Sequence, residues 1–113
     1  MSANPITAMP STGTALNPKP VVIDNDNGHV PSPFDYQHLN RYEDEAVWVS
    51  LNGSPFTVHF DPRHTPFNDH IFKVPAGGTR HSGPVIRGEH GEEFKYSVDG
   101  PVSSTDPKII VDP

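Results

Sequence analysis

Hydrophobic and polar residues alternate along the second half of the chain, which is the pattern of short β-strands that bury one face. Residues 56–60 ("FTVHF") and 93–98 ("EFKYSV") show this pattern most clearly. In both segments apolar side chains occupy every second position, and we expect them to point into a core: Phe56, Val58, Phe60, Phe94, Tyr96 and Val98. Thr57 and His59 then lie on the other face of their strand.

Residues 45–60 predict a β-hairpin, because two β-rich runs flank an Asn-Gly pair at 52–53 that suits the positive φ of a tight turn. Alternation places Trp48 on one face of the first run and three apolar residues on the other: Val47, Val49 and Leu51. Trp48 is therefore either the packing anchor of a second sheet or an exposed interface residue. We favour packing, because a lone tryptophan is commonly a core residue.

The remaining strands are shorter and flanked by turn residues. They are expected within 20–24 ("PVVID"), 69–79 ("DHIFKVPAGGT"), 81–88 ("HSGPVIRG") and 108–112 ("KIIVD"), whereas 25–36 reads as turn and loop. About seven short strands at regular spacing are typical of an all-β sandwich. We expect a small Greek-key β-sandwich over residues 20–113, preceded by a flexible tail.

The composition supports short strands and a small core. The hydrophobic fraction is 33%, and 14 prolines and 9 glycines oppose long helices. Residues 1–19 are poor in large apolar side chains, so we interpret them as a disordered tail. The same segment lacks the basic and apolar regions of a secretory signal, and no run is apolar enough to span a membrane. A soluble, cytoplasmic protein is the expectation.

Charge and cysteine content exclude several functions. The net charge is −6, and the eight basic residues are dispersed along the sequence, which argues against binding to nucleic-acid phosphates. The absence of cysteine removes disulfides, thiolate catalysis and thiolate metal ligands. No serine is flanked by the glycines of a nucleophile elbow, so we expect no enzyme and no cofactor.

The segment from Ala46 to Val111 resembles the cupredoxins in the order of its motifs. An aliphatic-aromatic strand ends near Asn52, and "PFTV" stands where these proteins have Pro-His-x-Val. A Pro-Ala-Gly turn follows at 75–77, "FKY" corresponds to the Tyr-x-Tyr that precedes cysteine in Tyr-x-Tyr-x-Cys, and "IIV" matches a final Ile-x-Val strand. This resemblance implies a cupredoxin-like sandwich.

The copper ligands that the resemblance would imply are missing. Phe56 replaces the first histidine, Ser97 stands at the cysteine position, and 99–107 contains neither the second histidine nor the methionine. A blue-copper centre needs a thiolate, two imidazoles and a weak axial ligand. The sequence therefore predicts a cupredoxin-like protein without type 1 copper.

The seven histidines leave one metal hypothesis open. His59, His64 and His70 lie within twelve positions, with Asp61 and Asp69 nearby, and imidazole suits copper(II), nickel and zinc. The alternative, which we favour, is that these histidines are solvated surface residues, because their spacing matches no structural zinc pattern. A calcium loop at 24–28 ("DNDNG") is likewise disfavoured against an Asx-rich turn, since the EF-hand spacing is wrong.

A non-enzymatic binding or structural module is the function that this sequence favours, and a histidine-dependent metal-binding protein is the alternative. An open sandwich leaves edge strands that can pair with another protein or with a second copy. In "KIIVD" the apolar residues are consecutive, so Ile110 would face a partner if its neighbours face the core. Ile110 and Trp48 are thus the candidate interface residues, with no nucleic acid and no membrane expected as partner.

Overall fold

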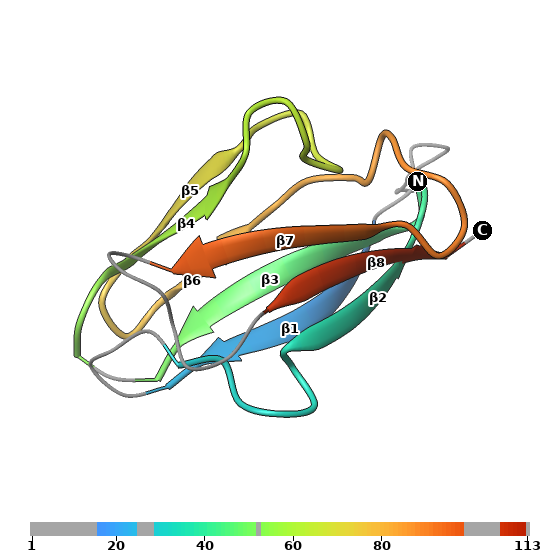
Figure 1. The fold of residues 1–113 in the computed structure, drawn as a ribbon. Coiled ribbons are helices and arrows are strands. Elements are labelled where there is room, and N and C mark those ends of the chain that lie inside the picture. Colours follow the sequence, from blue (N-terminus) through green and yellow to red (C-terminus); the bar gives the residue numbers. More distant parts are fainter. Residues whose placement is uncertain (1–15, 25–28, 52, 99–106, 113) are drawn as a thin grey trace, which may run out of the picture.

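Eight strands form two sheets that face each other in the structure, a computed structural model that describes residues 16–24, 29–51, 53–98 and 107–112 (Figure 1). The described residues include no helix, so none of them forms a helix that could span a membrane. This arrangement confirms the all-β sandwich expected from the alternating pattern.

The smaller sheet has the order β1-β3-β6. β1 (Asn17–Ile23) runs parallel to β3 (Asp44–Ser50), and β6 (Thr79–His81) pairs with β3 in the antiparallel sense. β1 therefore begins three residues before Pro20, where we had expected the domain to start. Residues 1–15 lie outside the described residues.

The larger sheet has the order β2-β8-β7-β4-β5. Its strands are β2 (Tyr36–Asn40), β4 (Phe56–Phe60), β5 (Ile71–Val74), β7 (Glu93–Val98) and β8 (Lys108–Asp112). β2 is parallel to β8, and the other neighbours are antiparallel. β2 was missed in the sequence, because Leu39 is its only fully buried residue and the others are polar or exposed.

The core lies between the two sheets and is rich in aromatic rings. Trp48 is fully buried and contacts the aromatic rings of Phe60, Phe67, Phe72 and Tyr96, at centroid distances between 4.9 and 6.1 Å. Trp48 is thus a packing residue of the core. The hypothesis that it is an exposed interface residue is wrong. The inward faces predicted for β4 and β7 are confirmed, because all six of their apolar residues are buried.

The predicted hairpin over residues 45–60 is wrong. β3 and β4 belong to opposite sheets, so the chain crosses the sandwich between Ser50 and Phe56 instead of turning back in one sheet. The inward residues of β3 are Ala46 and Trp48, whereas Leu51, just beyond the strand, is 62% exposed. Because β3 carries apolar residues on both faces, the sequence does not show which of the two faces points into the core.

The segment 81–88 is not the strand that we expected. Only His81 belongs to a strand, β6, and residues 82–88 form an irregular connection to β7. A turn follows at Gly88–Gly91, where both glycines have positive φ. The Asx-rich turn that we favour over a calcium loop at 24–28 falls largely on 25–28, outside the described residues; the flanking Asp24 and His29 pair through two backbone hydrogen bonds.

Candidate functional site

The positions of the cupredoxin ligands lie at the end of the sandwich where β4 begins and β7 ends. Phe56 opens β4 and is buried. Ser97 faces outward and pairs with His59 on β4, whereas Val98 is buried and pairs with Val58. The motif Tyr-x-Tyr-x-Cys, counted from Phe94, ends at Val98, so Val98 rather than Ser97 stands at the cysteine position.

Neither residue that replaces a ligand in this part of the chain can bind a metal. Phe56 and Val98 have hydrocarbon side chains, and both belong to the hydrophobic core. A metal ion in this position would need thiolate or imidazole donors. The loop 99–106, where the other two ligands would lie, is outside the described residues.

The structure does not bring His59, His64 and His70 together into a metal site. His59 lies on the exposed face of β4, and the His64 ring bonds to Glu92, with Nε2 3.1 Å from Oε2. His70 is held by its backbone, because its carbonyl accepts a 2.7 Å hydrogen bond from Phe60. Within 16–24, 29–51, 53–98 and 107–112, no group of three or more His, Asp or Glu side chains is placed to hold a metal ion.

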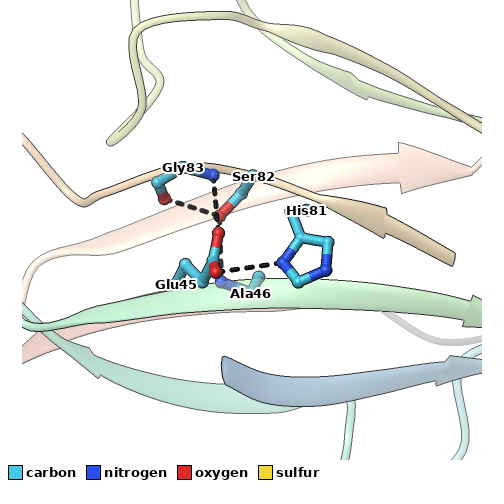
Figure 2. Close-up of polar contacts among 5 residues, drawn as sticks. All are labelled: Glu45, Ala46, His81, Ser82 and Gly83. Carbon is cyan, nitrogen blue, oxygen red and sulfur yellow. Dashed lines mark hydrogen bonds and ion pairs between the residues drawn. The ribbon is translucent and has the colours of Figure 1, made fainter. Parts of the chain in front are cut away.

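A polar cluster joins β6 to β3 (Figure 2). The Glu45 carboxylate lies 2.9 Å from His81 Nδ1 and accepts a 3.1 Å hydrogen bond from the Gly83 backbone N–H. The Ser82 hydroxyl accepts from the Ala46 N–H at 2.9 Å and donates to the Gly83 carbonyl at 2.8 Å. The cluster extends the pairing of β6 with β3 past the end of the regular ladder.

The same cluster contains a serine, a histidine and a carboxylate, yet it does not form a catalytic triad. A triad requires the imidazole to accept the proton of the serine hydroxyl. Here the Ser82 hydroxyl is buried and donates to a backbone carbonyl, while His81 bonds to Glu45. The contacts are those of a structural junction, and this geometry does not activate Ser82 as a nucleophile.

A groove of about 510 Å³ lies at the opposite end of the sandwich from the cupredoxin ligand positions. The turn between β2 and β3, the turn after β4 and the connection from β6 to β7 all reach this end, because β2, β4 and β6 finish here. Three of the four arginines in the sequence line the groove: Arg41, Arg63 and Arg87. A chain with a net charge of −6 therefore gathers most of its guanidinium groups in one place.

The wall of the groove is built from His64, Phe94 and Glu92. The His64 ring lies against the Phe94 ring, with 4.3 Å between centroids and 31° between planes. The Glu92 carboxylate accepts the backbone N–H of Glu89 at 3.0 Å and contacts His64. These two partners, the backbone hydrogen bond first, hold the pKa of Glu92 below its ordinary value.

The groove could not be anticipated from the sequence, because its arginines lie far apart along the chain and outside the alternating segments. For His64 the sequence offers a metal ligand or, as we favour, a solvated surface residue, and neither interpretation points to a groove. Connections at one end of a sandwich often carry binding residues on a rigid scaffold. The groove is thus a candidate binding surface among the described residues.

The fold and the replaced ligands define a cupredoxin-like β-sandwich that lacks copper-binding side chains at two of the four ligand positions. Solved structures to which the chain is similar include several forms of amicyanin. A copper(I) form of a methionine-to-alanine mutant covers 88% of this chain and 87% of its own, with 16% identity and a TM-score of 0.56. A reduced copper(I) form of a proline-to-glycine mutant at pH 4 has the same coverage, with 14% identity and a TM-score of 0.58.

An oxidized methionine-to-lysine mutant of amicyanin gives a TM-score of 0.57 at 18% identity over the same shares of the two chains. At these identities the likeness establishes the fold. No protein-family model matches the sequence, and no curated protein matches it either.

Proposed function

We propose that this protein is a non-enzymatic binding module in which a cupredoxin-like sandwich serves as a scaffold without a copper centre. The observation that carries the proposal is the burial of Phe56 and Val98 in the core, at the positions of a copper-binding histidine and cysteine. Apolar side chains there contribute packing energy and offer no lone pair to a metal. The fold is kept while the residues of its electron-transfer chemistry are replaced.

Binding through a surface groove fits this scaffold better than pairing through an edge strand. β5 lies beside β6 and β1 lies beside β2, so the open edges of the two sheets approach one another. In β1, Pro18 and Pro20 have no N–H to offer to an added strand. The Pro20 carbonyl already accepts a 2.8 Å hydrogen bond from Gln37 Nε2. A partner strand at β1 would find few free backbone groups.

The experiment that tests the proposal is metal analysis of the protein purified without an affinity tag. We expect elemental analysis to find no stoichiometric copper, nickel or zinc, and added copper(II) to leave the melting temperature unchanged. The matched control is the triple variant His59→Ala, His64→Ala and His70→Ala. A stoichiometric metal in the wild type that this variant loses would establish the histidine-dependent alternative and contradict the proposal.

A further inference from the structure

Three arginines line the groove, Arg41, Arg63 and Arg87, and hydrogen bonds within the chain anchor the guanidinium group of Arg87. Two hydrogen bonds anchor the Arg87 side chain, because its Nη1 donates to the backbone carbonyls of Thr65 and Phe67 at 2.9 and 2.7 Å. Its charge remains, since a carbonyl does not neutralise a guanidinium group. Arg87 therefore contributes a positive charge whose guanidinium group is anchored by two hydrogen bonds.

The turn that carries Arg41 is held in place by the neighbouring Tyr42. Tyr42 has a φ of 63°, which is unusual for a bulky residue, and two hydrogen bonds hold it there. Its N–H donates to the Val85 carbonyl at 3.0 Å, and its hydroxyl donates to the Ile86 carbonyl at 3.3 Å. These contacts tie the turn that contains Arg41 to the connection that contains Arg87.

The groove's cations have few partners inside the chain. Among the described residues Arg41 forms no hydrogen bond or ion pair, and Arg63 is 92% exposed, with only a distant contact of 3.9 Å to Asp61. The Glu92 carboxylate already contacts the His64 ring and accepts a hydrogen bond from the Glu89 N–H. Glu89 is the remaining carboxylate on the rim. Two guanidinium forks are thus available for carboxylates from outside.

We propose that this groove binds an extended acidic peptide segment, whose carboxylates pair with Arg41 and Arg63. The inference rests on the binding role proposed above and assigns its partner. An open groove that joins three connections suits an extended chain, and charge complementarity selects an acidic one. Because the whole chain carries −6, its net charge does not favour an acidic peptide, and attraction has to come from a local group of cations such as the one in the groove.

The test is fluorescence anisotropy of a fluorescein-labelled hexaglutamate peptide titrated with the full chain at low salt. We expect binding that weakens as salt rises, and a loss of affinity of about tenfold in Arg41→Glu and in Arg63→Glu. Both side chains are exposed, so these variants should stay folded. Glu89→Gln should strengthen binding several-fold, because it removes the repelling carboxylate from the rim.

Lys73→Glu is the matched control, since it makes the same change of charge at an exposed position on β5 outside the groove. Equal losses in Lys73→Glu and Arg41→Glu would overturn the proposal by showing an effect of net charge alone. Absence of peptide binding by the wild type would also overturn the proposal, and would leave the proposed copper-free scaffold unaffected.

Binding of inorganic phosphate without the peptide would mark a simple anion site. Self-association abolished by Arg41→Glu would mark a second copy as occupant, and either result would contradict the peptide assignment.

Discussion

The indole ring of Trp48 meets the ring of Tyr96 edge-on, with 5.9 Å between centroids and 78° between planes. Trp48 Nε1 and the Tyr96 hydroxyl are both buried, and neither has a hydrogen bond of ordinary geometry within the described part of the chain. Burial raises the pKa of the Tyr96 hydroxyl well above its ordinary value, and the opposing effect of the Trp48 indole is smaller.

Tyr96→Phe should reduce the loss of folding stability at alkaline pH. The folded pKa is raised, so the contribution of the neutral hydroxyl is present below the unfolded pKa of about 10 and is lost as the pH rises above it. Urea unfolding at about pH 8 and about pH 11 measures this. We expect the wild type to lose more stability than Tyr96→Phe between the two conditions, and Tyr36→Phe, an exposed control, to behave like the wild type.

At neutral pH, Tyr96→Phe should cost less than about 1 kcal/mol or be stabilising, because it removes a buried hydroxyl without a partner. A loss above about 2 kcal/mol would show that the hydroxyl has a hydrogen-bond partner in the folded protein.

Phe60→Ala should destabilise the domain by about 3–5 kcal/mol. Phe60 is buried, and its ring contacts those of Trp48, Phe67, Phe72 and Tyr96, so truncation leaves a cavity among rings that cannot collapse easily. Urea unfolding followed by tryptophan fluorescence gives the free energy of unfolding. Phe60→Leu, which fills most of the space, is the control and should cost clearly less. Wild-type-like unfolding of the alanine variant would contradict the aromatic core.

Glu92→Gln should remove part of the acid sensitivity of the fold. The Glu89 N–H and His64 lower the pKa of Glu92 below 4.5, so the stability that it contributes is present above that value and is lost as the pH falls toward the folded pKa. Urea unfolding at neutral pH and near pH 3.5 measures the loss. The wild type should lose more than Glu92→Gln over this range. An identical loss in both proteins would mean that the carboxylate makes no such contacts in solution.

The sequence predicted β4 and β7 because each alternates between apolar and polar residues and therefore has one obvious inner face. The prediction failed where a strand has too few apolar residues to alternate, and where a strand has apolar residues on both faces. β2 has a single fully buried apolar residue, Leu39, and β3 is apolar on both faces. The Asn-Gly pair at 52–53 is a local turn signal, and it carries no information on whether the chain stays in one sheet or crosses to the other.

The missing copper ligands could be recognised from the sequence, since the loss of a cysteine is a matter of residue type. The groove could not, because three distant turns make it. Arg41, Arg63 and Arg87 meet only after the two sheets have brought the ends of β2, β4 and β6 together.

Ile110→Lys and Ile109→Lys should behave differently although the residues are adjacent. Ile109 is fully buried in the core, whereas Ile110 is half-buried on the outer face of β8, between His38 on β2 and Glu93 on β7. A lysine at 109 would bury an unpaired charge, so we expect that variant to unfold. A lysine at 110 reaches solvent beside Glu93 and should cost less than about 1 kcal/mol. Circular dichroism with size-exclusion chromatography separates the outcomes. Unfolding of Ile110→Lys would place the residue in the core, and a shift of the folded variant to a smaller species would show that Ile110 forms an interface.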